Sequence, residues 1–177
     1  MTIYALGNKK PEIASTAYVH PQASVIGDVK IGERVFVAPM ASIRGDRGRI
    51  EIDDETNVQD GATIHSDPQF VTKIGKRVNI GHNATIHAES IEDNAAIGMG
   101  AVLMLGCKVA RGAMIANSAL LHNKTKTEPN KIYAGVPAKY MRDLNPTGEA
   151  RKAIDIYLES YTAGTELYKK YLREVED

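Results

Sequence analysis

The sequence of 177 residues predicts an all-β fold, a triangular parallel β-solenoid of about six coils, followed by one long C-terminal α-helix. Two periodic patterns predict this order. Aliphatic residues recur every six positions over two thirds of the chain, and beyond residue 146 the apolar spacing changes to three and four. In addition, the chain has no Trp and only two Phe beside 15 Gly, so its core must be narrow and regular.

The six-residue repeat extends over 18 units, interrupted by a few inserted residues. An amphipathic helix does not explain it, because the apolar stripe of a helix recurs every 3.6 residues. Short strands with polar residues at the corners do explain it, if three hexads form one coil and each coil pairs with the next at about 4.8 Å. A β-sandwich with coincidental spacing is the alternative. The repeated aliphatic residues are Ile13, Val19, Val25, Ile31, Val37, Ile43, Ile52, Val58, Ile64, Ile74, Ile80, Ile86, Ile91, Ile97, Leu103, Val109, Ile115 and Leu121.

A second repeated position supports the first. Four residues after nearly every aliphatic residue stands a small side chain or valine, as expected where a triangular interior leaves little room at its corners. These residues are Ala17, Ala23, Val29, Val35, Ala41, Thr56, Ala62, Val78, Ala84, Ala95, Ala101, Cys107, Ala113 and Ala119.

The repeat also defines the organisation of the chain. We expect the solenoid over residues 11–122, a loop and exit segment over 123–146, and a helix over 147–177 that packs on the prism. Thr147 is the expected N-cap of this helix, because its hydroxyl can accept a hydrogen bond from the first turn. A free-standing coiled coil is the lesser alternative.

Charge and cysteine content exclude several classes of function. The 22 Lys and Arg residues balance the 22 Asp and Glu residues, so neither nucleic acid nor a membrane is expected as a partner. The single cysteine, Cys107, cannot form an internal disulfide or a multi-cysteine zinc site, and it suits a reducing compartment. We find no apolar leader or membrane-length apolar run, and therefore expect a cytoplasmic protein.

The repeat places histidines in register. The residue after the aliphatic position on the third face is, coil by coil, Arg44, His65, His87, Met104 and His122. His65 and His87 should therefore stack one coil apart, at roughly 5 Å, where two imidazoles can bind one metal ion. His122 should lie about 10 Å beyond His87, too far to bind the same ion.

His82 belongs to the second face of the predicted prism. Asp60 should lie one coil away from it, with Gln59 next in sequence. A site with three histidines would then need a partner subunit to bring its own His82 beside His65 and His87. Three-fold packing of prisms would create one such site at each interface.

Several motifs are similar to those of the hexapeptide-repeat family, whose fold is the left-handed β-helix. They lie at Ile31–Val35 and at Ile80–Ala84. With the runs Arg44–Asp46 and Asn57–Gly61, the chain resembles the γ-class carbonic anhydrase branch of that family. It is similar to the short bacterial and archaeal members, which include carnitine- and phenylacetate-operon proteins. The left hand of the coil is implied by this resemblance alone.

The resemblance implies a homotrimer in which His65 and His87 of one chain and His82 of its neighbour hold Zn²⁺, with Fe²⁺ or Co²⁺ as alternatives. Three neutral imidazoles leave one position open for water, and the metal lowers the pKa of that water so that a hydroxide can attack CO₂. Gln59 would orient the hydroxide.

The resemblance further implies that Arg44 and Asp60 form a charged pair across the subunit interface, with Asp46 in the same network. One departure concerns the acidic loop that carries protons away in active members. Here Asp46 is followed by Arg47, and the stretch after His65 offers only Asp67. Hydration of CO₂ releases a proton in each cycle, so this departure should limit turnover.

Three classes of function therefore compete. The first is a zinc-dependent lyase that hydrates CO₂ to bicarbonate. The second is an acyl-CoA-dependent acyltransferase or thioesterase of the same family, with a thioester as substrate. An acyltransferase needs one histidine as a base, so the three histidines His65, His82 and His87 favour the first class. The third is a metal-stabilised trimer without catalytic activity.

Overall fold

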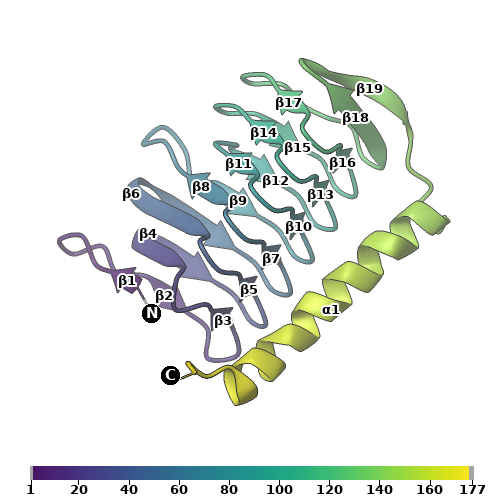
Figure 1. The fold of residues 1–177 in the computed structure, drawn as a ribbon. Helices are drawn as coiled ribbons and strands as arrows, with labels where there is room; N and C mark the ends of the chain where they lie inside the picture. Colours follow the sequence, from purple (N-terminus) through teal and green to yellow (C-terminus); the bar gives the residue numbers. More distant parts are fainter. Residues whose placement is uncertain (1, 176–177) are drawn as a thin grey trace.

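The computed structural model describes residues 2–175 and shows a three-sided prism of parallel strands with one helix beside it (Figure 1). The solenoid has about seven turns, and the helix α1 (Glu149–Tyr171) runs along its length. The predicted solenoid with a single C-terminal helix is thus confirmed. One further turn is present beyond the six that the hexads predict.

Each coil contributes a short strand to each of three faces, and equivalent strands of successive coils pair in parallel. The first face consists of β2 (Glu12–Ile13), the second halves of β4 (Ser24–Ile31) and β6 (Ser42–Ile52), β9 (Thr72–Ile74), β12 (Ser90–Ile91) and β15 (Lys108–Val109). The second consists of β3 (Tyr18–Val19), β5 (Phe36–Val37), β7 (Asn57–Val58), β10 (Asn79–Ile80), β13 (Ala96–Ile97), β16 (Met114–Ile115) and β18 (Lys131–Gly135). The third consists of β1 (Thr2–Tyr4), the first halves of β4 and β6, β8 (Thr63–His65), β11 (Thr85–Ile86), β14 (Val102–Leu103) and β17 (Leu120–Leu121).

The core is the ladder of aliphatic and small residues that the repeat predicts. Of the 18 aliphatic positions, only Ile13 at the first coil is partly exposed, and the small residues four positions later are all buried. Burial of a fully enclosed isoleucine contributes about 1.5–3 kcal/mol, so a column of them stabilises the prism along its whole length. Cys107 occupies one of the small positions, and burial raises its pKa to about 12, so this thiol is unreactive.

Strands β4 and β6 continue through a corner and join the first and third faces into one 11-stranded sheet. Two glycines permit the bend. Gly27 has φ +81°, and a Cβ atom there would lie 2.6 Å from the carbonyl oxygen of Gly45. Only glycine combines this conformation with such close backbone contact.

The segment after the repeat is more ordered than the predicted loop and exit. Strand β18 continues the second face by pairing in parallel with β16, and β19 (Ala138–Asp143) folds back on β18 as an antiparallel partner. This hairpin supplies the additional turn. It also covers the last strand of the second face, which would otherwise expose unpaired backbone groups.

The helix begins two residues later than the sequence predicts. Its N-cap is Gly148, which makes no side-chain cap, and the expected cap Thr147 lies in the preceding turn. The backbone N–H and the hydroxyl of Thr147 both donate to Oδ1 of Asn145. Those hydrogen bonds hold Thr147 outside the helix. At the other end, α1 ends at Tyr171, whereas the predicted helix continues to residue 177. Residues 176–177 of that span lie outside the described part of the chain.

Aromatic side chains hold the helix against the second face of the prism. Phe36 lies 5.1 Å from Tyr18, 5.3 Å from Tyr161 and 5.2 Å from Tyr168, measured between ring centroids. The packed pairs have the tilted or edge-on geometry that aromatic rings prefer. No helix in the described part of the chain has both the length and the hydrophobicity to cross a membrane.

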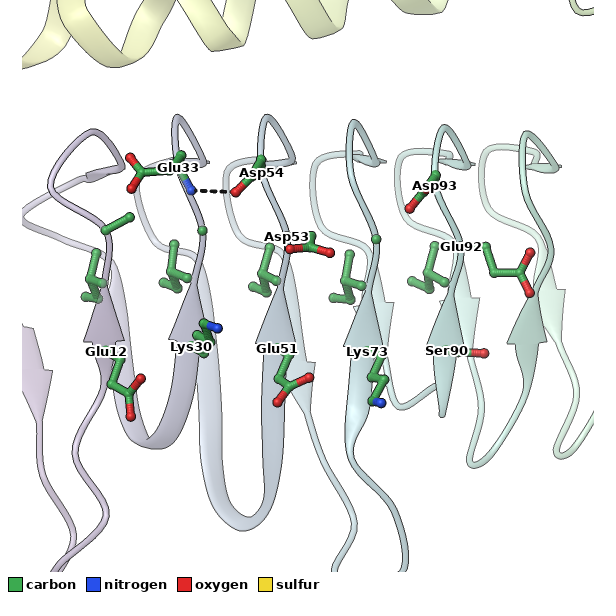
Figure 2. Close-up of a pocket in the computed structure, with 18 of the residues that line it drawn as sticks. Glu12, Lys30, Glu33, Glu51, Asp53, Asp54, Lys73, Ser90, Glu92 and Asp93 are labelled. Carbon is green, nitrogen blue, oxygen red and sulfur yellow. Dashed lines mark hydrogen bonds between the residues drawn. The ribbon is translucent and has the colours of Figure 1, made fainter.

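A broad groove of about 670 Å³ lies on the first face, and Figure 2 shows the charged side chains along it. Glu12, Lys30, Glu51 and Lys73 occupy paired positions on β2, β4, β6 and β9. Opposite charges on adjacent strands avoid the repulsion that stacked like charges would cause. The alternation is therefore explained by strand pairing, and none of the described residues that line the groove is a histidine.

Candidate metal centre

Two histidines stack on the third face, where β8 and β11 end. Strand β8 ends at His65, and His87 follows β11, whose Ile86 pairs with Ile64 of β8. The centroids of the two imidazole rings are 5.1 Å apart. The spacing of one coil that the sequence predicts is confirmed, because both histidines occupy the same position in successive turns.

One ring nitrogen of His87 has no hydrogen-bond partner within the described part of the chain. Its Nε2 atom is buried and has no hydrogen-bond partner among the described residues. An unsatisfied buried polar atom costs about 1–3 kcal/mol, so it needs a physical explanation. Burial lowers the pKa of His87, and the adjacent His65 lowers this pKa further. The ring is therefore neutral near pH 7, which is the form that binds a metal ion.

A carboxylate orients the other ring of the pair. Nε2 of His65 lies 3.1 Å from Oδ1 of Asp46, and Nη1 of Arg44 lies 2.7 Å from Oδ2 of the same carboxylate. Burial raises the pKa of Asp46, but the hydrogen bonds from Arg44 and His65 together outweigh it, and the pKa lies below its usual value. Because an ionised carboxylate only accepts hydrogen bonds, Nε2 of His65 donates, which leaves Nδ1 as the nitrogen that could bind a metal.

His82 has its own carboxylate partner at a corner of the second face. Its Nδ1 lies 2.9 Å from Oδ2 of Asp60, which leaves Nε2 as the basic nitrogen when the ring is neutral. The backbone of the corner aligns the two residues, since the N–H of Asn83 donates to the carbonyl of Asp60 at 2.9 Å. The predicted juxtaposition of Asp60 and His82 is confirmed. Pairs of histidine and carboxylate of this kind hold metal-binding imidazoles in one orientation.

Gln59 lies next to this corner and is nearly buried. Its Nε2 donates to Oδ1 of Asn57 at 3.0 Å and to Oδ1 of Asn79 at 2.9 Å. Both amide protons are thereby used, so the carbonyl oxygen Oε1 is the atom left to contact a ligand. Gln59, Asn79 and His82 line a cavity of about 340 Å³ between the second face and α1, together with Met99.

The sequence analysis missed the two asparagines that hold Gln59. Asn57 and Asn79 are paired on adjacent strands β7 and β10, each directly before a buried aliphatic residue. An outward-facing amide repeated at one position in successive coils is the signal that could have identified them. Nδ2 of Asn57 is itself buried and unpaired among the described residues.

The predicted site residues thus form two half-sites within one chain. The first half-site contains Arg44, Asp46, His65 and His87 on the third face, and the second contains Gln59, Asp60 and His82 on the second face. No group of three or more His, Cys, Asp or Glu residues converges within residues 2–175 in a way that could hold a metal ion. Within the chain, Arg44 pairs with Asp46 and Asp60 pairs with His82. The Arg44–Asp60 pair is predicted between neighbouring chains and stays a prediction.

Curated proteins with similar sequences fall into two groups. The carnitine operon protein CaiE of Proteus sp. is 34% identical over 145 residues, which cover 82% of this chain and 74% of that protein. The mitochondrial gamma carbonic anhydrase 2 of Arabidopsis thaliana is 37% identical over 149 residues, which cover 81% of this chain and 54% of that protein. The chain therefore spans about half the length of the plant protein. No protein-family model matches the chain.

Solved structures with the same fold cover nearly the whole chain. A putative acetyltransferase from Bacillus cereus has a TM-score of 0.83 and 32% identity, covering 96% of this chain and 97% of that structure. A hexapeptide transferase family protein from Anaplasma phagocytophilum has a TM-score of 0.85 and 31% identity, covering 94% and 98%. These matches establish the left-handed β-helix that the sequence motifs imply.

Proposed function

Because the chain belongs to the γ-carbonic anhydrase-like branch of the hexapeptide-repeat family, we propose that it is a metal-dependent enzyme that hydrates CO₂. His65 and His87 of one chain and His82 of a neighbour in a homotrimer would hold Zn²⁺, with Fe²⁺ or Co²⁺ as alternatives. The observation that carries the proposal is the stacked histidine pair, in which the buried Nε2 of His87 has no partner among the described residues.

The donor set fits a metal ion. His87 is neutral near pH 7 because burial lowers its pKa, and His65 and His82 each face a carboxylate through one nitrogen. When bound, the metal would supply a Lewis acid that makes water nucleophilic at neutral pH. Asp46 and Asp60 would hold the partly buried imidazoles of His65 and His82 in fixed orientations.

In the proposed reaction, Gln59 orients the attacking water and does not bind the metal. Asn57 and Asn79 accept both of its amide protons, so Gln59 presents only a carbonyl oxygen. That oxygen can accept a hydrogen bond from a water molecule and thereby orient the lone pair of the water toward CO₂. We therefore assign Gln59 as the residue that positions the attacking water.

The separation of the two half-sites supports a shared site between chains. A third imidazole within one chain does not reach His65 and His87, because His82 lies on a different face. His82 lies at the corner between β10 of the second face and β11 of the third, so closed cyclic symmetry would bring this corner of one chain against the third face of the next and repeat the same contact in every subunit. A trimer of this kind would contain one complete site at each interface.

The test is stopped-flow hydration of CO₂, followed with a pH indicator on zinc-loaded protein. His82→Ala should lower the catalysed rate to the background rate. His122→Ala is the matched control, because His122 continues the column of His65 and His87 beyond their reach, and it should retain the wild-type rate. Equal rates for wild type and His82→Ala, with zinc still bound to the wild type, would contradict the proposal.

A second candidate is chemistry on a thioester. The cavity of about 340 Å³ beside Gln59 and His82 is far larger than CO₂ requires and includes the apolar side chains of Met99 and Met114. Two structural relatives carry transferase names. Hydrolysis of short acyl-CoA thioesters, followed by release of free thiol, should be measured with the same variants. Activity that is lost in His82→Ala but retained in His122→Ala would establish this second candidate.

A further inference from the structure

Positively charged residues surround Asp46, whose carboxylate contacts His65. Nζ of Lys9 donates to the backbone oxygen of Asp46 at 2.8 Å, and Arg44 pairs with the Asp46 side chain at 2.7 Å. Arg47 follows directly, and its backbone N–H donates to Oδ1 of Asp46 at 3.0 Å. Three cationic residues thus stand beside one aspartate, whose carboxylate also contacts His65.

Two irregular segments bring these cations together. Lys9 ends a tight turn after β1, in which Leu6 and Lys9 exchange backbone hydrogen bonds and Gly7 has φ +60°. Arg47 lies in the stretch by which β6 exceeds the six-residue repeat. In Figure 1, the loop after β1 and the loop after β8 project from the same edge of the prism. Lys9 therefore lies on the side of the prism where β8 ends at His65.

The other charges nearby already have partners. Arg49 forms ion pairs with Asp28 at 2.7 Å and with Glu51 at 2.8 Å. The carboxylate of Asp67, whose charge acts on His87, accepts a hydrogen bond from the backbone N–H of Gln69. By contrast, within residues 2–175 no carboxylate lies within ion-pair distance of the Arg47 or Lys9 side chains. The charges of these two side chains are therefore available for a ligand.

We propose that Lys9 and Arg47 form an oxyanion-binding subsite beside Asp46 and the His65–His87 pair. The guanidinium of Arg47 matches a planar or tetrahedral oxyanion through two parallel hydrogen bonds, and Lys9 adds a point charge. The inference rests on the proposed function in one respect, since it assigns an anionic group to the substrate or product of that site. Bicarbonate and the phosphate groups of a CoA thioester share this chemistry.

Calorimetric titration at low ionic strength tests the subsite, because salt would screen an exposed site. Bicarbonate, inorganic phosphate and CoA are each titrated into wild type, Arg47→Gln and Lys9→Gln, with and without bound zinc. Loss of one charged hydrogen-bond donor should weaken binding about five- to tenfold. Lys10→Gln is the matched control, since Lys10 is an exposed neighbour of Lys9, and its affinity should equal that of wild type.

The outcomes separate the possible anions and the two proposals. Weaker binding of bicarbonate alone in Arg47→Gln and Lys9→Gln would assign the subsite to the hydration reaction, and weaker binding of CoA and phosphate would assign it to a thioester. The same loss without zinc would show that the side chains, and not the metal, bind the anion. Absence of anion binding to wild type, or an equal loss in Lys10→Gln, would overturn the subsite. CO₂ hydration can fail while this binding remains, so the two proposals fail separately.

Discussion

At the scale of single residues, the orientation of each histidine depends on the group that its ring contacts. Asp46 accepts a hydrogen bond from His65, and Asp60 accepts one from His82, whereas His87 is held by burial and has a ring nitrogen with no partner among the described residues. Because a carboxylate partner determines which nitrogen of a neutral ring is basic, these aspartates set the direction in which an imidazole can bind a metal.

We expect Asp60→Asn to weaken zinc binding by about 10- to 100-fold, as found for other carboxylates that orient metal-bound histidines. The substitution preserves shape but removes the charge that fixes His82. Competition with a colorimetric chelator measures the affinity. Asp53→Asn, an exposed change on the first face, should leave it unchanged. Equal affinities in Asp60→Asn and wild type would show that Asp60 does not orient a ligand.

At the scale of elements, the helix is held to the prism by one ion-pair network besides its aromatic contacts. The nearly buried Arg151 donates to Asp155 one turn later and to the carbonyl of Asn94 on the prism. The hydrogen bond from Arg151 lowers the pKa of Asp155, and Arg77 lowers it further against the opposing effect of burial. The network therefore joins α1 to a corner of the second face.

This network makes the stability depend on pH. The folded-state pKa of Asp155 lies below the unfolded value of about 3.9, so its contribution is complete above that value and is lost as the pH falls through the folded pKa. Asp155→Asn should lower the unfolding temperature at pH 7, and the difference from wild type should shrink below about pH 3. Glu159→Gln, an exposed change on the same helix, should have no effect at either pH. A constant difference between pH 7 and pH 3 would contradict the assignment.

At the scale of the whole molecule, the solenoid separates the chemistry into two half-sites. Strand pairing places His65 and His87 on the third face, and it places Gln59, Asp60 and His82 on the second. Within the described residues these groups do not converge on one ion. Assembly of identical chains would complete the site without changing the fold of any subunit.

Complementation between variants tests this assembly. His82→Ala and His87→Ala should each be inactive alone. If they are mixed in equal amounts, unfolded and refolded together, about a quarter of the interfaces should combine an intact His65–His87 pair with an intact His82 from the neighbour. CO₂ hydration, or thioester hydrolysis under the second candidate, should then recover to about a quarter of the wild-type rate. A mixture that stays inactive although it assembles would contradict a shared site.

Much of the fold and part of the site could be predicted from the sequence, because in a six-residue repeat the sequence number of a residue gives its coil and its face. The alignment of His65 with His87 and of Asp60 with His82 follows from counting coils. The N-cap of α1 could not be predicted in this way, because Thr147 instead hydrogen-bonds with Asn145. The order in β18 and β19 was missed as well, since these two strands do not carry the six-residue pattern and form by pairing with β16, in the last coil of the repeat, and with each other.

The sequence by itself determined the solenoid, its core and the column of histidines, since each of them follows from the six-residue repeat. Only the tertiary structure decided which side chains of different coils and turns contact one another. It showed that Asp46 holds His65, that Asn57 and Asn79 use both amide protons of Gln59, and that Lys9 reaches Asp46. These contacts depend on rotamers and on irregular turns, which the repeat does not encode.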